Sequence, residues 1–299
     1  MKVRIAVAPG SSMVDRAAFC RFIDGLESFG FDTVWLSDVP LGTVVDPLVG
    51  LALAAGRTER LKLGANVVVP GRSPLVLAKQ LAQLDRLSDG RLLLSFVPGQ
   101  DSPAERAALG TEGDDRGALI DEVMGLCRRW WAGETVEYRS ERFDVRGVAV
   151  DPVPLQSPLE LWLGGMGPRA LRRVGRLADG WLTARIGPEQ AGAGRRTIEQ
   201  AAAEAGRTID PEHFGISVPY SREPLTEDAV AAVLRRPGAK PVEADRRDIL
   251  PVGAAELVDL LQRHIAEGLT KFVLRPVQLP RGWDDELAWL AGTVLPLQR

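Results

Sequence analysis

The chain has 299 residues, of which 45% are hydrophobic and 26% are charged, the balance of an ordinary globular protein. Lys and Arg number 37 against 40 Asp and Glu, so the basic surplus of most nucleic-acid-binding proteins is missing. Two cysteines and two histidines argue against a disulfide scaffold and against a metal site. The first ten residues lack the apolar core of an export signal, and no apolar run of about 18 residues predicts a membrane span. We therefore expect a cytoplasmic protein without nucleic-acid, membrane or metal partners.

Strand and helix patterns alternate from the start of the chain. Short apolar runs predict strands, and amphipathic runs with capping residues predict the helices between them. Asp46 followed by Pro47, for example, is typical of a helix start. Residues 135–150 alternate in polarity and predict a hairpin. Before this hairpin, strands are predicted at residues 3–8, 33–37, 61–69 and 91–97, and helices at 15–29, 46–58, 74–87 and 114–131.

The second half of the chain continues this alternation. Strands are predicted at residues 159–163, 180–183, 214–219 and 271–274, and helices at 168–177, 188–205, 254–267 and 283–295. Repeated strand–helix units predict a parallel sheet that is covered on both faces. We expect a single α/β domain over residues 1–299, a TIM-like (β/α)₈ barrel, with an open doubly wound sheet as the alternative. The irregular stretch 219–249 is predicted to be an insertion after the seventh strand.

Two carboxylates follow strand ends, where a barrel of this kind places its chemistry. Asp38 comes directly after the second strand, beside apolar Trp35 and Leu36. In one interpretation, Asp38 lies in a partly water-excluded site at the end of the barrel, where it has a perturbed pKa or anchors a ligand. In the other, it simply caps a backbone turn. Glu105, beyond the fourth strand, is either an acid that reaches back over the mouth or a solvated residue at the start of a helix. Both alternatives stay open at both positions.

A glycine-rich turn and two arginines also lie after strands. Gly164, Gly165 and Met166 join the fifth strand to the next helix. Glycines let a ligand approach the main chain and a helix amino end attracts anions, so the turn suits a phosphate, with tight packing as the alternative. Arg185 and Arg275 follow the sixth and eighth strands. Each is expected either to bind an anionic substrate group or to make a structural ion pair.

Short motifs spread over most of the chain form a family pattern. The most specific part is residues 60–92, which include the run Ser88-Asp89-Gly90-Arg91-Leu92. Matching segments also lie at residues 30–38, 46–49, 161–165, 178–181 and 272–276. Together these motifs resemble the bacterial luciferase-like family of flavin- and deazaflavin-dependent oxidoreductases.

The resemblance implies a TIM-like barrel, often a homodimer, with FMN or the deazaflavin coenzyme F420 in its mouth. In this family a bulge after the third strand, often with a non-prolyl cis peptide, supports the ring of the cofactor. Two further loops meet the ring and the ribityl phosphate. The three corresponding segments here are Ala65-Asn66-Val67, Val97-Pro98-Gly99 and Gly164-Gly165-Met166.

The chain departs from the family pattern at two places. Val39 stands where many deazaflavin-dependent relatives have a histidine, and Ala65-Asn66 stand where several relatives have Thr or Ser. Glu105 then becomes the candidate acid–base residue, with Asp38 as a positioning group. We expect Glu105→Gln to lower turnover at unchanged cofactor affinity, and full activity of this variant would contradict the role.

The favoured function is an oxidoreductase that transfers a hydride between F420 and an organic substrate. The Arg-rich, Lys-poor composition supports F420 by association, because it is typical of actinobacterial chains. An FMN-dependent monooxygenase with a separate flavin reductase is the alternative. A barrel that binds a ligand without turnover, and a lyase or isomerase without a redox cofactor, also stay open. A homodimer would use the helices at 46–58 and 74–87, whose apolar stripes could equally be core.

Overall fold

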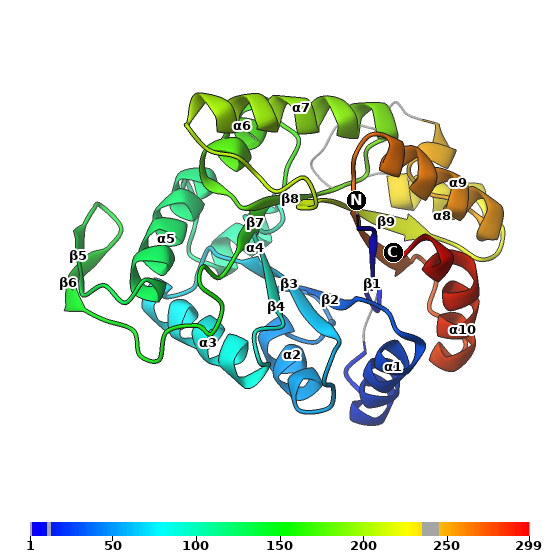
Figure 1. The fold of residues 1–299 in the computed structure, drawn as a ribbon, viewed down its shortest axis with the longest axis horizontal. Helices are drawn as coiled ribbons and strands as arrows, with labels where there is room; N and C mark the ends of the chain where they lie inside the picture. Colours follow the sequence, from blue (N-terminus) through cyan, green and yellow to red (C-terminus); the bar gives the residue numbers. More distant parts are fainter. Residues whose placement is uncertain (1, 11–12, 235–244, 299) are drawn as a thin grey trace.

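The computed structural model of the chain describes residues 2–10, 13–234 and 245–298. Eight parallel strands close into a barrel, seen along its axis in Figure 1. Around the barrel they follow the order β1 (Arg4–Val7), β2 (Thr33–Ser37), β3 (Lys62–Val68), β4 (Leu92–Val97), β7 (Leu161–Leu163), β8 (Gly180–Ala184), β9 (Phe214–Tyr220) and β10 (Lys271–Pro276). The predicted (β/α)₈ barrel is confirmed, and the open doubly wound sheet is wrong because β10 pairs with β1.

In the described residues, eight helices lie around the barrel, in the arrangement that Figure 1 shows. They are α1 (Arg16–Phe29), α2 (Pro47–Ala55), α3 (Pro74–Leu87), α5 (Arg116–Trp131), α6 (Pro168–Leu177), α7 (Pro188–Glu204), α9 (Gly253–Ala266) and α10 (Trp283–Val294). Asp46 caps α2 by accepting the N–H groups of Leu48 and Val49 at 2.9 and 3.1 Å, as its sequence predicts. In the described part of the chain, no helix is both long and apolar enough for a membrane crossing.

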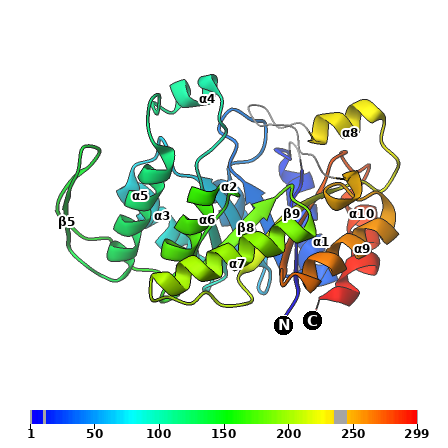
Figure 2. The same cartoon turned by 90° about the horizontal axis from the view of Figure 1, so that it is seen from above.

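Several shorter elements lie outside the barrel strands and the eight surrounding helices. The predicted hairpin is present as β5 (Val136–Arg139) and β6 (Asp144–Val148). The others are α4 (Pro103–Ala108), α8 (Glu227–Leu234), η1 (Arg246–Asp248) and η2 (Leu295–Leu297). In the side view of Figure 2, α4 and α8 stand at one end of the barrel and the termini at the other. Of the stretch 219–249, residues 235–244 lie outside the described residues.

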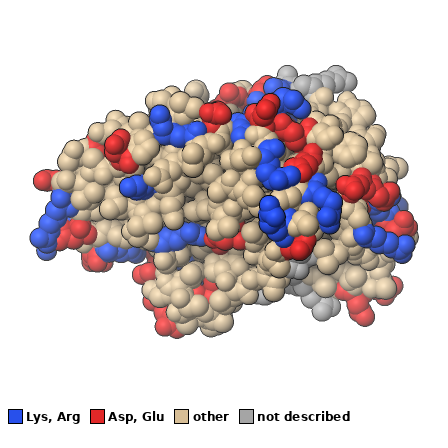
Figure 3. All heavy atoms as spheres, turned by 90° about the horizontal axis from the view of Figure 1, so that it is seen from below, with Lys and Arg blue, Asp and Glu red and all other residues tan. Residues whose placement is uncertain are grey.

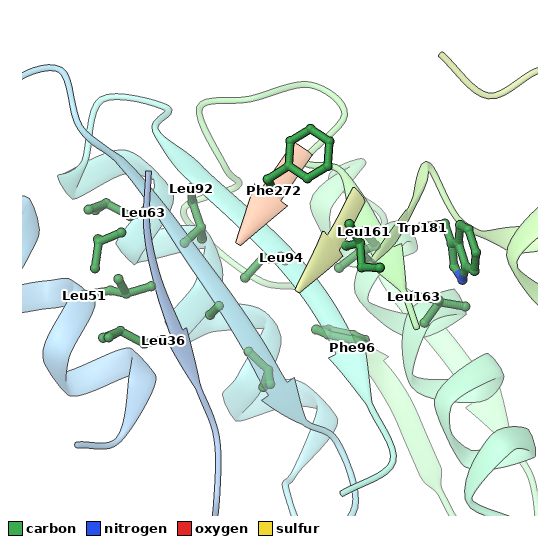
Figure 4. Packing of buried hydrophobic residues seen from close by; sticks show 14 of the residues in the cluster. Leu36, Leu51, Leu63, Leu92, Leu94, Phe96, Leu161, Leu163, Trp181 and Phe272 are labelled. Atoms are coloured by element: carbon green, nitrogen blue, oxygen red, sulfur yellow. The ribbon is translucent and has the colours of Figure 1, made fainter. Parts of the chain in front are cut away.

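Most of the core lies between the barrel and its helices. Outward-facing side chains of the strands, such as Leu63, Leu94 and Leu161, are fully buried there (Figure 4). Both cysteines are also buried, as expected of small apolar groups. Burial on this scale is the main source of stability of the fold.

Two tryptophans fill the inside of the barrel. A side chain on Gly64 of β3 would lie 2.1 Å from the ring of Trp35 on β2. In the same way, a side chain on Gly180 of β8 would lie 2.4 Å from the ring of Trp162 on β7. Each large residue therefore needs a glycine on the neighbouring strand. The two rings form part of a packed layer that separates the two ends of the barrel.

Below this layer, at the amino ends of the strands, the interior is polar. A cavity of about 240 Å³ is lined by Arg4, Lys62, Arg91, Glu160, His213 and Lys271, among others. The buried Lys271 ammonium donates to Asp32 and to the hydroxyl of Thr33. Burial alone would raise the pKa of Asp32, but the charge and hydrogen bond of Lys271 outweigh it and lower this pKa to about 2. The pair therefore ties the start of β10 to the start of β2.

Candidate active site

The opposite end of the barrel, where the strands finish, is called the mouth here. Strand register and alternation place one residue of each of seven strands at this level on the inner side. All seven are partly or fully exposed, unlike most of their chain neighbours on the strands. They are Ser37, Asn66, Val97, Gly164, Ala184, Ser217 and Arg275. Active sites of this fold occur at this end.

The third strand brings only one of its three predicted residues to the mouth. Ala65 and Val67 are fully buried on the outer side of β3, whereas Asn66 faces inward and donates to the Ser37 hydroxyl at 3.0 Å. The expected bulge is wrong, because Leu63 to Val68 pair with β4 in continuous register. The cis peptides of the described residues are Asp151-Pro152 and Ser157-Pro158, so the expected cis bond at 65–67 is also wrong. A regular strand sends alternate side chains to opposite faces, which leaves only main-chain contacts to the other two residues.

Asp38 is held by its neighbours rather than open to the mouth. Its side chain is 6% exposed and accepts from Arg72 at 2.7 Å and from the Val68 amide at 3.1 Å. Arg72 also donates to the Val68 carbonyl at 3.0 Å and lies 3.4 Å from Asp46. Asp38 therefore positions the connection after β3. The sequence reasoning missed Arg72, since no local pattern links residues 34 positions apart.

Glu105 lies underneath the loop that follows β4. Only 2% of it is exposed, so the solvated alternative is wrong. Its Oε1 accepts the Gln100 amide at 2.5 Å, and a side chain on Gly99 (φ 75°) would lie 2.4 Å from that oxygen. Arg116, which the sequence reasoning also missed, donates to the carbonyls of Pro98 and Gln100 at 3.1 and 2.8 Å. The two side chains fix the loop that begins at Val97; the acid–base role of Glu105 stays a prediction.

The turn after β7 exposes its main chain to the mouth. Gly165 adopts a φ of 101°, and its carbonyl accepts from the Trp181 indole at 3.0 Å. A side chain on Gly165 would lie 2.9 Å from Ala170, and one on Gly164 would lie 3.0 Å from a carbonyl oxygen. Helix α6 then starts after Gly167, and no side chain of the described residues caps it, so its first N–H groups have no capping partner there. These features fit the phosphate of a flavin-type cofactor.

The two predicted substrate arginines lie near enough for the charge of Arg185 to act on Arg275. Arg275 ends the inner face of β10, and Arg185 follows β8 with a left-handed φ of 59°. Burial lowers the pKa of Arg275, and the nearby charge of Arg185 lowers it further. Within the described ranges, no three His, Cys, Asp or Glu side chains gather as a metal-ligand set.

Comparison with known proteins identifies the family. The profile of the luciferase-like monooxygenases matches residues 2–266. The chain belongs to the luciferase-like monooxygenase family. The resemblance seen in the short motifs is therefore confirmed, with its strongest segments inside the matched region.

Individual relatives are distant and cover only part of each protein. Limonene 1,2-monooxygenase of Rhodococcus erythropolis is 29% identical over 65% of this chain and 52% of its own length. An F420-dependent glucose-6-phosphate dehydrogenase of Beutenbergia cavernae is 30% identical over 66% of this chain and 62% of its own length. The chain thus spans less than two thirds of these relatives. The solved structure of an F420-dependent secondary alcohol dehydrogenase matches over 100% of both chains with a TM-score of 0.83 and 19% identity, which concerns the fold alone.

Proposed function

We propose that this chain is an oxidoreductase that transfers a hydride between coenzyme F420 and a small organic substrate. The observation that carries this proposal is the glycine turn at Gly164 and Gly165 with the uncapped amino end of α6, at the mouth of a luciferase-like barrel. F420, when bound, would supply the hydride chemistry, and the protein would bind and orient it. The F420-dependent dehydrogenase among the relatives supports this choice of cofactor.

The side chains around the mouth divide into binding and positioning groups. Free N–H groups at the start of α6 would hold the phosphate, and Val97 with the main chain of Gly99 would lie along the ring. Asn66 offers an amide at the same level, next to Ser37. Asp38 and Glu105 keep the loops after β3 and β4 in place, so that the surface under the ring is rigid. If Glu105 also moves a proton, its loop must first open.

An FMN-dependent monooxygenase is the second candidate, favoured by the limonene 1,2-monooxygenase among the relatives. The same phosphate contacts would serve FMN, since both cofactors carry a phosphate on a ribityl chain. This function would require a separate flavin reductase as a partner. For either function we propose a homodimer, formed through the exposed faces of α2 and α3.

A fluorescence titration of the purified protein with F420 and with FMN tests the proposal. We expect saturable F420 binding at least about tenfold tighter than FMN binding, a difference of about 1.4 kcal/mol. Preference for FMN would move the function to the monooxygenase. Binding of neither cofactor would contradict both candidates and favour a barrel without redox chemistry.

A pair of glycine variants tests where the cofactor binds. Gly165→Ala introduces a methyl group 2.9 Å from Ala170 at a φ of 101°. We therefore expect the phosphate cradle, formed by the turn at Gly164 and Gly165 and the start of α6, to distort, and F420 affinity to fall about tenfold or more. Gly133→Ala is the matched control, because Gly133 also has a positive φ, 81°, but has no atom near its added methyl group. Equal F420 affinities in both variants, with both folded by circular dichroism, would contradict the proposed phosphate site.

A further inference from the structure

The polar cavity at the amino ends of the strands is separate from the mouth. It lies at the end of the barrel where the termini are, opposite α4 and α8 (Figure 2). The packed layer that contains Trp35 and Trp162 closes it off from the mouth. Its volume of about 240 Å³ is well above the roughly 15 Å³ that one water molecule needs, and it is partly open to solvent. It therefore has room for a small ligand.

The lining of this cavity gathers positive charge from several strands. Arg4 on β1 and Lys271 on β10 are register partners, and Lys62 on β3 and Arg91 before β4 line the cavity with them. Burial lowers the pKa of Lys271, the charge of Asp32 opposes this effect, and the charges of Lys62 and Arg4 add to it, so that the pKa is about 8. Cations that face one cavity create a positive potential in it.

Two carboxylates beside the cavity serve three of these cations. Asp32 contacts Lys271 and also lies 4.0 Å from the Lys62 ammonium. Glu212 pairs with Arg4 at 2.6 Å. A carboxylate that is shared between two ammonium groups neutralises only one of them, so this part of the lining keeps an excess of positive charge.

Arg91 adds a charge that neutral groups hold. Its guanidinium donates to the Thr58 hydroxyl at 2.7 Å and to the carbonyls of Leu61, Ala55 and Ser88 at 3.0, 3.1 and 2.7 Å. Among the ion pairs of the described residues, none includes Arg91. These oxygens fix its position without cancelling its charge.

Two buried donors of the lining have no acceptor. Trp35 is 2% exposed, and its indole N–H has no partner among the residues that the structure describes. The buried Nε of Arg4 also has none within that set. A buried donor without an acceptor costs free energy, and most such groups in proteins are paired. Both residues line the cavity, so an acceptor bound there is in a position to satisfy them.

Glu160, just before β7, brings a carboxylate into the same lining. Its Oε2 lies 3.6 Å from Nε2 of His213 and 3.4 Å from the indole nitrogen of Trp162. A carboxylate repels a fully ionised anion, but it accepts a hydrogen bond from an anion that keeps an O–H group. At neutral pH inorganic phosphate keeps at least one O–H group, whereas sulfate has none. The lining therefore favours phosphate over sulfate.

We propose that this cavity is a binding site for inorganic phosphate. The phosphate oxygens would accept from Arg4, Lys62 and the Trp35 indole, and its O–H group would donate to Glu160. The bound anion would tie the starts of β1, β2, β3 and β7 together and stabilise the folded barrel. The proposal is independent of the proposed function, because none of these residues belongs to the mouth.

The first experiment compares two anions in the absence of any cofactor. Phosphate and sulfate are titrated into the purified protein by calorimetry, at constant ionic strength set with chloride. We expect saturable phosphate binding with a Kd of about 1 mM or below, and sulfate binding at least about tenfold weaker. Absence of phosphate binding, or equal affinity for the two anions, would overturn the proposal.

A lysine variant places the site in the cavity. Lys62→Gln removes a partly exposed cation of the lining, and we expect it to weaken phosphate binding about tenfold or more. Lys2→Gln is the matched control: it makes the same charge change at an exposed lysine close to the start of β1, and it should bind phosphate within about twofold of the parent. Equal phosphate affinities in the two variants, with both folded by circular dichroism, would contradict the site.

Glu160→Gln tests the choice of anion. The variant replaces a charged acceptor with a neutral amide of the same shape, which also carries N–H donors. We expect sulfate to bind about tenfold more tightly than it does to the parent, so that the preference for phosphate largely disappears. A phosphate preference that stays as large as in the parent would overturn the role of the O–H group and with it the proposal.

A last comparison separates this site from the proposed cofactor site. Gly165→Ala, which changes the phosphate cradle at the mouth, should bind inorganic phosphate like the parent, and phosphate should not compete with F420 in the fluorescence titration. Phosphate binding that is lost in Gly165→Ala but kept in Lys62→Gln would place the anion at the mouth and overturn the proposal. If F420 does not bind while phosphate binding still depends on Lys62, the proposed cofactor fails and the cavity site stands.

Discussion

His264 on α9 is buried, and neither of its ring nitrogens has a hydrogen-bond partner among the residues that the structure describes. Burial lowers its pKa to about 4, the charge of Arg263 adds to this effect, and Asp248 opposes it. The ring is therefore neutral in the folded protein. Below the ordinary histidine pKa, about 6.5, the unfolded chain takes up a proton that the folded protein refuses. Stability is consequently lost as the pH falls from 6.5 towards 4.

Replacing this histidine tests that reasoning. We expect His264→Leu to be at least as stable as the parent at pH 7.5, because it removes an unpaired buried N–H. At pH 5 its advantage should grow by about 2 kcal/mol. Urea unfolding of both proteins at the two pH values measures the difference. An advantage that does not change with pH would contradict a neutral His264.

Gly64 is the residue on which the packing of Trp35 depends. Gly64→Ala puts a methyl group 2.1 Å from the indole ring, inside a closed barrel that cannot yield easily. We expect a loss of about 3 kcal/mol in the free energy of unfolding. Gly125→Ala on α5 is the matched control, since nothing lies near its added methyl group and alanine favours a helix by about 1 kcal/mol. Denaturant unfolding should give opposite signs for the two variants, and equal signs would contradict the packing.

Single residues also mark the limit of what the sequence can predict. Asp46 caps α2 through contacts two and three residues away, which a local motif encodes. Arg72 and Arg116 reach residues 34 and 18 positions away, and only the closed barrel brings these groups together. Glu105 is buried because Gly99 leaves room for its carboxylate, a steric detail that no spacing rule contains.

Strands and helices are encoded more directly than contacts. The barrel strands are short and mainly apolar, so all eight could be placed from the sequence, with ends that differ by at most two residues. Helix α2 ends at Ala55 rather than Thr58, and α4 has only six residues, too few for a periodic pattern. The bulge expected in β3 came from the family resemblance. The structure shows instead that β3 pairs regularly with β4.

At the scale of elements, Asp32 and Lys271 join the starts of β2 and β10. The pKa of Asp32, about 2, lies below its value in an unfolded chain, about 3.9. Its contribution to stability is therefore present above pH 4 and is lost as the pH falls from 4 to 2. The shift corresponds to roughly 2 to 3 kcal/mol.

Asp32→Asn should be severely destabilised at neutral pH, by about 4 kcal/mol, because it leaves the buried Lys271 cation unpaired. The difference from the parent should shrink as the pH is lowered from 5 to 3 in urea unfolding experiments. Asp24→Asn is the matched control: its partner Arg57 is on the surface, so the cost should stay below about 1 kcal/mol at every pH. A cost at Asp32 that is independent of pH would contradict the lowered pKa.

At the scale of the whole molecule, one side of the barrel is poor in charge. Helix α2 contains no charged residue, and it packs against α3. Several large apolar side chains of the two helices are exposed, namely Val49, Leu53, Leu75, Val76 and Leu87. Figure 3 views the molecule from the side of α1, α2 and α3, and uncharged atoms cover much of its middle. The apolar stripes of these helices are thus not all used by the core of one chain.

A second copy of the chain is the occupant that this face favours, because an apolar patch can pair with itself about a twofold axis. We expect a dimer in sedimentation velocity and a monomer for Val76→Asp, whose side chain is 53% exposed and would place a charge in the contact. Leu279→Asp is the matched control, since Leu279 is 62% exposed in the connection after β10, and it should leave the dimer intact. The monomeric variant should keep its F420 affinity, because α2 and α3 contribute no residue to the cradle after β7. A parent protein that sediments as a monomer at micromolar concentration would contradict the dimer, and a Val76→Asp variant that stays dimeric would move the contact away from these helices.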